Sequence, residues 1–258
     1  MKRWAILMGG FAVGVLGACG SDADPPADSG APPQVDAAAD NVSSPDSGAP
    51  GVDASGPQCP QEAEALLGPI DSVSTGDVTI LSDAQGTKTL YVDASAGGTQ
   101  AQSMNPRLYL NLATGKRVDV TDKSAATSPA WDIAFKRPIL FSNGGDGGSG
   151  QGGTRFLPDR DFASVTASDA ATATFARESF FDAGCTPKTD QTGAVLTSFD
   201  GWYTYDGSNN SLTATPGTWL VKGGAGNVFK VRFISYYATP DGGVGPSGGR
   251  FTLEVSAL

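Results

Sequence analysis

Histidine is absent from all 258 residues of this chain. Catalysis by a serine–histidine–aspartate triad or a cysteine–histidine pair, zinc bound by histidine, and haem bound by two histidines are therefore excluded. The Gly-x-Ser-x-Gly match at residues 245–249 has neither a strand–turn–helix setting nor a base to activate its serine. A hydrolase that uses paired carboxylates is the remaining enzymatic alternative, and no motif supports it. The sequence therefore predicts a protein that is not an enzyme.

Metal-binding motifs are missing as well. The glycine-rich stretch at residues 144–153 contains a single acidic residue, Asp146, and no Gly-Lys-Ser or Gly-Lys-Thr follows it. It therefore does not match a calcium- or phosphate-binding loop, and it predicts a mobile loop between strands. No metal site is expected.

Residues 20–58 have no aromatic residue, no lysine and no arginine. They consist mainly of alanine, aspartate, proline, serine and glycine, and the pentapeptide Asp-Ser-Gly-Ala-Pro occurs twice, at 28–32 and at 46–50. A segment with so little apolar surface to bury cannot offset the entropy of ordering, so it predicts a disordered tether. Its aspartates account for most of the formal net charge of −10. The rest of the chain has no basic cluster, which argues against nucleic acid as a partner.

The amino terminus has three parts: a short cationic start at residues 1–4, an apolar run at 5–15, and Leu16-Gly-Ala-Cys19. The apolar run is too short to cross about 30 Å of hydrocarbon as a helix and is typical of a removable signal peptide. A cysteine directly after Leu-Gly-Ala resembles the bacterial lipobox. That resemblance implies a diacylglycerol on the Cys19 thiol, cleavage before Cys19 and acylation of the new amino group, which together anchor a protein stably to a lipid bilayer. The alternative is an ordinary signal peptide followed by an incidental cysteine.

The expected organisation is a signal peptide at residues 1–18, the lipidated cysteine and its tether at 19–58, and one folded domain at 59–258. Gly20, rather than an aspartate, follows the lipidated cysteine and favours transport to the outer membrane. We therefore expect a lipid-anchored protein of the outer membrane.

Two cysteines, Cys59 and Cys185, lie in the expected domain. An even number of cysteines in an exported protein predicts a disulfide between them. Two free thiols are the alternative.

The domain is expected to be all-β and mainly antiparallel, with at most one or two short helices. Alternation of apolar and polar residues with period two, the pattern of a half-buried strand, recurs through it. One short helix is expected at residues 60–67, ended by Gly68-Pro69, and a hairpin loop at 223–227. Strands are expected at residues 78–81, 88–93, 107–112, 131–135, 139–142, 201–205, 218–222, 229–237 and 251–255.

The alternation also predicts which side chains share a face of their strand. The three predicted sets are Trp131, Ile133 and Phe135; Phe229, Val231, Phe233, Ser235 and Tyr237; and Phe251, Leu253 and Val255.

Several segments in the second half resemble one known family. They are Tyr109-Leu-Asn-Leu-Ala-Thr-Gly115, Trp131-Asp-Ile-Ala-Phe135, Asn143-Gly-Gly-x-Gly-Gly-Ser-Gly150, Trp202-Tyr-Thr-Tyr-Asp206 and Val228-Phe-Lys-Val-Arg-Phe-Ile-Ser-Tyr-Tyr237. In order and spacing they look like the HmuY-like family, and the resemblance covers roughly residues 105–258. It implies an all-β lipoprotein of the outer membrane or cell surface. The best-known members take haem from host proteins and pass it to a TonB-dependent outer-membrane receptor.

The chain departs from the family at the expected iron ligands. Some members bind iron through two histidines and some relatives use methionines, and we expect the two ligand regions near residues 175–181 and 207–211. Neither region contains a histidine or a methionine. After removal of the signal peptide the one methionine left is Met104. Tyr203 and Tyr205 are the nearest residues of a type that binds haem iron, and strand alternation places them on one face.

Two functional hypotheses follow. The first is a membrane-anchored HmuY-like lipoprotein that captures haem or a related flat ligand and delivers it to an outer-membrane receptor. The second is a surface binding or structural module on the same scaffold that has lost the axial ligands, in which Tyr203 and Tyr205 pack on the sheet. Trp131 and Trp202 are assigned to the core or to a pocket wall.

Overall fold

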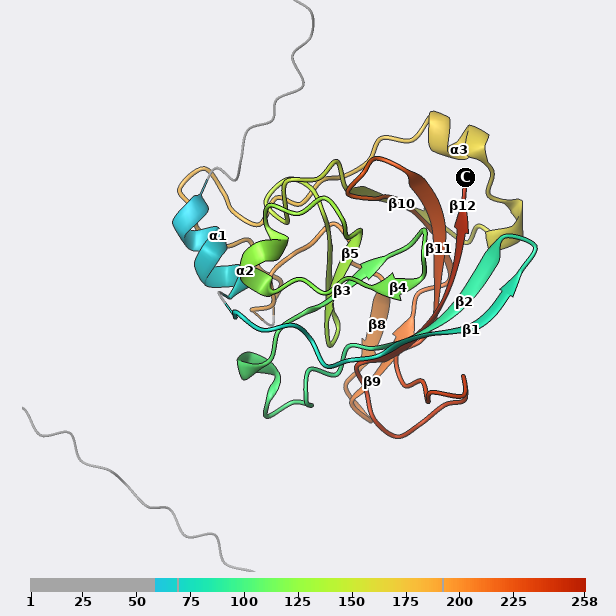
Figure 1. The fold of residues 1–258 in the computed structure, drawn as a ribbon, viewed down its shortest axis with the longest axis horizontal. Helices are drawn as coiled ribbons and strands as arrows, with labels where there is room; N and C mark the ends of the chain where they lie inside the picture. Colours follow the sequence, from blue (N-terminus) through green and yellow to red (C-terminus); the bar gives the residue numbers. More distant parts are fainter. Residues whose placement is uncertain (1–58, 69, 192) are drawn as a thin grey trace, which may run out of the picture. The chain divides into compact units, whose positions relative to one another are not determined.

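The computed structural model describes residues 59–68, 70–191 and 193–258 (Figure 1). The predicted signal peptide, the lipidation site at Cys19 and the tether at 20–58 lie outside the described residues. Within the described part of the chain, no helix has both the length and the apolar character needed to span a membrane.

A six-stranded antiparallel sheet is the larger of the two main sheets. Its strands are β1 (Val78–Ala84), β2 (Thr87–Asp93), β7 (Gly153–Pro158), β10 (Gly217–Lys222), β11 (Val228–Ser235) and β12 (Arg250–Ala257). They lie in the order β1-β2-β12-β11-β10-β7, so the last strand of the chain pairs with β2 (Figure 1). The Gly-rich residues between Lys222 and Val228 close the predicted hairpin of β10 and β11, because the Gly223 amide donates to the Asn227 carbonyl.

The described residues also form a four-stranded antiparallel sheet and a separate hairpin. The sheet has the order β4-β3-β5-β6, and the hairpin joins β8 to β9. The bounds are β3 Leu108–Asn111, β4 Lys116–Arg117, β5 Ile133–Lys136, β6 Ile139–Ser142, β8 Tyr203–Asp206 and β9 Ser211–Ala214.

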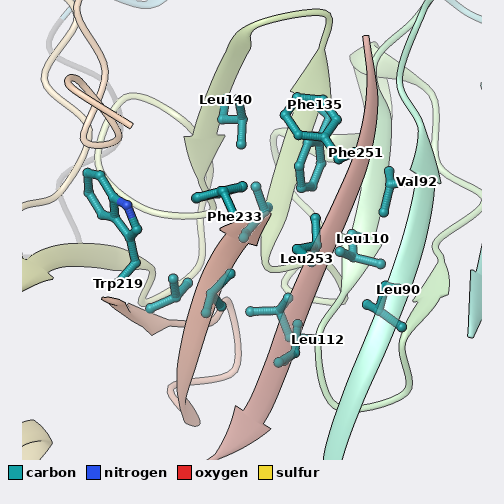
Figure 2. Close-up of a cluster of buried hydrophobic side chains, with 14 of the residues drawn as sticks. Leu90, Val92, Leu110, Leu112, Phe135, Leu140, Trp219, Phe233, Phe251 and Leu253 are labelled. Atoms are coloured by element: carbon teal, nitrogen blue, oxygen red, sulfur yellow. The ribbon is translucent and has the colours of Figure 1, made fainter. Parts of the chain in front are cut away.

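The main core lies where the inner faces of the two sheets meet. Side chains from the four-stranded sheet pack against β11 and β12; the rings of Phe135 and Phe251, for example, are 5.2 Å apart between centroids (Figure 2). Alternation explains this packing, because Phe251, Leu253 and Val255 all project inward as predicted. The all-β, mainly antiparallel fold class is confirmed.

The four-stranded sheet is also buried on its opposite face. There Tyr109, Ala134 and Phe141 form a second core, to which Trp131 and Phe180 belong. The rings of Trp131 lie 5.0 Å from Tyr109 and 5.8 Å from Phe141 between centroids. The four-stranded sheet is therefore covered on both faces. The half-buried strands predicted from the alternation would leave one face exposed.

The described residues form three short α-helices, one more than the predicted upper limit. They are α1 (Pro60–Leu67), α2 (Asp122–Ala125) and α3 (Ala167–Ala171), and two 3₁₀ turns lie at Gln102–Met104 and Phe162–Ser164. The predicted helix at 60–67 agrees with α1. The other two are single turns that begin with capping boxes, at Thr121 and at Thr166, and are too short to show helical periodicity.

Two predictions of shared faces need correction. Trp131 precedes β5 and packs in the second core, while Ile133 and Phe135 face the main core. In β11 the register shifts between Phe233 and Ser235, so that Tyr236, and not Tyr237, becomes buried in the main core. A β-bulge inserts one residue and reverses the alternation beyond it, which period-two reasoning cannot detect.

Three strands were not predicted from the sequence. β4 has two residues, too few for a pattern. β7 begins at the end of the glycine-rich stretch and ends at a proline, both of which disfavour a strand in sequence reasoning. β9 follows the polar turn after Asp206 and pairs only with β8.

Candidate functional site

The predicted tyrosine pair lies on the β8–β9 hairpin. Tyr203 is half-buried against the main core, and its ring centroid is 4.9 Å from that of Trp202. Tyr205 is 58% exposed, and its hydroxyl group donates to Asn210 Oδ1 at 2.5 Å. The hairpin thus presents one phenol to solvent and holds the other against the sheet.

The hairpin tip coincides with the second expected ligand region, residues 207–211. Its turn is held by Asp206, whose Oδ1 accepts from the Ser208 amide at 2.9 Å and from the Ser208 hydroxyl at 2.7 Å. These hydrogen bonds hold the pKa of the exposed Asp206 carboxyl below its usual range. Asn210, which binds Tyr205, adopts a positive φ of 58°, a conformation that asparagine tolerates better than most residues.

An aromatic cluster packs against the β8–β9 hairpin. Trp202 is buried, its ring centroid lies 5.1 Å from that of Phe233, and its indole N–H donates to the Pro138 carbonyl at 2.9 Å. Tyr237 fixes β9, because its hydroxyl oxygen accepts from the Leu212 amide at 2.9 Å. The sequence assignment of Trp202 to the core agrees with this placement.

Burial raises the pKa of two phenols in this cluster. Desolvation raises the pKa of Tyr236 to about 12, and the nearby Arg137 opposes the shift. For Tyr203 the pKa is also raised, by burial first and then by the charges of Asp190 and Asp200. A metal ion at Tyr203 would therefore have to displace a tightly held proton.

Met104 lies in a different connection. It ends the 3₁₀ turn between β2 and β3 and is 74% exposed. Met104 therefore belongs to that connection and not to the β8–β9 hairpin that carries the tyrosine pair.

The first expected ligand region, residues 175–181, has exposed positions such as Arg177 and Ser179, and three of its side chains are buried. Phe180 and Phe181 are buried in the second core. Glu178 is 3% exposed, and its carboxylate accepts four hydrogen bonds: from the amide and hydroxyl of Ser142 at 2.6 and 2.9 Å, and from those of Ser198 at 2.7 and 2.5 Å. Burial raises the pKa of Glu178, and the four donors offset part of that shift.

Sequence reasoning did not identify Glu178 or two other buried carboxylates. Asp132 accepts from the amides of Leu112 and Gly224 at 2.7 and 3.0 Å. Asp122 accepts from the Tyr109 hydroxyl at 2.9 Å and pairs with Arg107 at 3.3 Å. Their partners are distant in sequence, so no local motif marks them. Each of the three carboxylates accepts hydrogen bonds from segments distant in the sequence.

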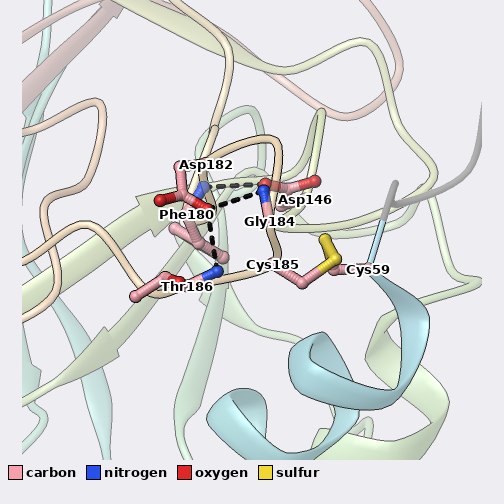
Figure 3. The surroundings of a disulfide bond; sticks show 7 residues. All are labelled: Cys59, Asp146, Phe180, Asp182, Gly184, Cys185 and Thr186. Atoms are coloured by element: carbon pink, nitrogen blue, oxygen red, sulfur yellow. Dashed lines mark hydrogen bonds between the residues drawn. A yellow bond between two sulfur atoms is a disulfide. The ribbon is translucent and has the colours of Figure 1, made fainter.

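The disulfide joins Cys59, just before α1, to Cys185 (Figure 3). The loop that carries Cys185 is ordered by Asp182, whose Oδ1 accepts from the amides of Gly184 and Thr186 at 2.9 Å each. Asp146, from the glycine-rich stretch, accepts from the Phe180 amide at 2.7 Å, a few residues before this loop. Through Asp146 the glycine-rich stretch is therefore tied to the chain at Phe180.

Several hollows mark the surface. One, of about 550 Å³, lies between α3 and the last residues of β12, and small residues such as Ala167, Ala170 and Ala257 line it. A second, of about 390 Å³, includes Ser247 of the Gly-x-Ser-x-Gly match beside Arg250. A third, of about 200 Å³, is mostly apolar and lies near α1.

Comparison with known proteins gives similar solved structures of low identity. A candidate lipoprotein from Bacteroides fragilis is 18% identical, with 70% of this chain and 94% of that chain covered and a TM-score of 0.43. A candidate HmuY-like haem-binding protein from Bacteroides vulgatus is 16% identical, with coverage of 70% and 96% and a TM-score of 0.42. The apo form of an HmuY analogue from Tannerella forsythia is 15% identical, with coverage of 68% and 99% and a TM-score of 0.43.

No curated protein matches the chain. The family model for the HmuY protein matches residues 103–246, more than half of the chain. This range contains β3 to β11, and with them the β8–β9 hairpin and the buried Glu178. The chain belongs to the HmuY family.

Proposed function

We propose that this protein is a lipid-anchored binding protein that captures haem or a related flat ligand at the β8–β9 hairpin. The observation that carries the proposal is the exposed phenol of Tyr205, on the same strand as the half-buried Tyr203. Tyrosine oxygen is one of the few side-chain ligands that proteins use for haem iron. The ring of Tyr203, half-buried on β8 and backed by the buried Trp202, offers an apolar surface for a flat molecule.

In this proposal Tyr205 is the first iron ligand, because its side chain is exposed; on binding iron its hydroxyl group would lose its proton and give up the hydrogen bond to Asn210. Tyr203 is the second candidate and would need to lose a proton that burial holds. Met104 is the weakest of the three candidates, since it lies on the connection between β2 and β3.

The anchor and the partner are part of the same proposal. A lipid on Cys19 would hold the protein to the outer membrane, and residues 20–58 would give the domain reach from the lipid surface. A TonB-dependent receptor in that membrane is the partner that the family implies. Neither catalysis nor nucleic-acid binding belongs to the proposed function.

A haem-free surface module is the second candidate. The burial of Glu178, Phe180 and Phe181 favours it, because these side chains of the first expected ligand region stabilise the interior and do not face a ligand. In this alternative Tyr203 packs on Trp202, and the hairpin contacts a protein or polymer.

A haemin titration separates the two. Haemin is added to the purified full chain, and the Soret band is recorded in the ferric and ferrous states. The proposal predicts a saturable shift at one equivalent, which Tyr205→Phe weakens and the double variant Tyr203→Phe/Tyr205→Phe abolishes. Tyr91→Phe, on β2, is the matched control and should leave the shift unchanged. A spectrum identical to free haemin would reject haem capture and leave the surface module.

A further inference from the structure

A small apolar cavity lies between the end of α1, the β5–β6 hairpin and residues 194–197. Its volume is about 200 Å³, below the usual range of about 300–1,000 Å³ for drug-sized ligands. The apolar part of its lining consists mainly of Leu66, Leu67, Ile139, Phe141, Phe180 and Val195. The cavity therefore suits a ligand that is small and largely aliphatic.

Arg107 is one of two cations in the lining, and its charge is already balanced. Its guanidinium group pairs with Asp122 at 3.3 Å and lies 5.3 Å from the centroid of the Phe141 ring. It also donates to the carbonyls of Leu66 and Leu67, at the end of α1. Arg107 thus holds the helix over the cavity.

Lys136 is the second cation, and its charge is not balanced. It ends β5 and is half-buried, and the ion pairs of the described residues do not include it. Burial lowers the pKa of Lys136, the charge of Arg107 lowers it further, and Asp122 opposes both. An anion beside its ammonium group would restore charge balance at this end of the cavity.

We propose that this cavity binds a fatty acid of medium chain length. The carboxylate lies against Lys136 and Arg107, and the chain lies against the apolar lining. Complementarity of charge at one end and of apolar surface along the rest selects this class over a neutral lipid or a cation. This site is separate from the β8–β9 hairpin, so it does not depend on haem capture.

The test is a calorimetric titration of octanoate into the full chain carrying Cys19→Ala, so that no lipid of the protein itself competes with the probe. We expect saturable binding at one equivalent, with octanol, the matched neutral probe, bound at least about tenfold more weakly. Lys136→Met should weaken octanoate binding by about tenfold to a hundredfold, because it removes a charge-assisted contact. Lys116→Met, an exposed lysine on β4, should have no effect.

Two further variants keep the result interpretable. Lys136→Gln replaces Lys136→Met if the latter loses its native circular dichroism spectrum. Val195→Phe fills the cavity without changing its charge and should abolish binding. The proposal is overturned if octanoate shows no saturable binding to the folded chain, if octanol binds equally well, or if the Lys136 variants bind octanoate unchanged.

Discussion

At the scale of single residues, the buried Glu178 carboxylate accepts four hydrogen bonds. It joins Ser142, at the end of β6, to Ser198, and no strand pairing connects these two segments. The carboxylate holds the two segments together, because the donors of Ser142 and Ser198 would otherwise be buried without an acceptor. Glu178 is therefore a structural residue in a region where the family is expected to place a functional one.

Glu178→Ala should lower the free energy of unfolding by about 3 kcal/mol, since it leaves buried donors of Ser142 and Ser198 without an acceptor. Equilibrium unfolding in urea measures the change. Glu64→Ala, at an exposed position of α1, is the matched control and should change the free energy by less than about 0.5 kcal/mol. A loss below about 1 kcal/mol for Glu178→Ala would show that water or neighbouring groups replace the carboxylate.

The same residue predicts a pH dependence. Because burial raises the pKa of Glu178 in the folded state, the folded protein binds more protons than the unfolded one above the ordinary pKa of 4.5. This group's contribution to stability is therefore fully present below that pH and is lost as pH rises through the folded-state pKa. Exposed aspartates such as Asp182, with lowered pKa, act in the opposite direction.

The difference in the free energy of unfolding between wild type and Glu178→Gln separates the effect of Glu178 from that of the aspartates. Relative to the wild type, the variant should gain stability as pH rises from about 4.5 to 7, because it has no proton to lose. Urea unfolding at each pH measures it. A constant difference across this range would mean that the four hydrogen bonds outweigh burial.

At the scale of elements, α1 depends on contacts from distant parts of the chain. It has eight residues, too few for an isolated helix to be stable in water. The disulfide to Cys185 holds its start, and Arg107 binds the carbonyls at its end. The helix is therefore an element that the domain stabilises, and not one that stabilises itself.

Cys59→Ser/Cys185→Ser should lower the free energy of unfolding by about 2–5 kcal/mol, because the bond closes a long loop. It should also increase hydrogen exchange of the α1 amides before that of the main core. Wild type in reductant is the paired comparison and should behave like the variant. Equal stability with and without the bond would show that α1 is held by packing alone.

The sequence predicts elements whose pattern is local, and it does not predict features that depend on contacts between distant segments. The strand at Phe251–Val255 was predicted because one of its faces is buried along its whole length. Beyond Phe233 the prediction failed, because a single bulge residue reversed the two faces. The partners of Glu178 and the cation pair of Arg107 and Lys136 could not be predicted, since each set comes from segments brought together only by folding.

At the scale of the whole molecule, family membership is established over residues 103–246, whereas the anchor is a proposal from the first nineteen residues. Cys19→Ala should stop incorporation of labelled palmitate and release the protein from the membrane fraction. Cys185→Ser, which removes a cysteine from the domain, should still be labelled. An unmodified Cys19 thiol in the mass spectrum of the purified wild type would reject lipidation.

The disulfide also makes a covalent ring of residues 59–185. A protease that cuts the backbone once inside this ring opens it but releases no fragment, so both pieces stay in one covalent molecule. A cut after Cys185 has no such protection, and β8 to β12 would then be held to the rest by non-covalent contacts alone.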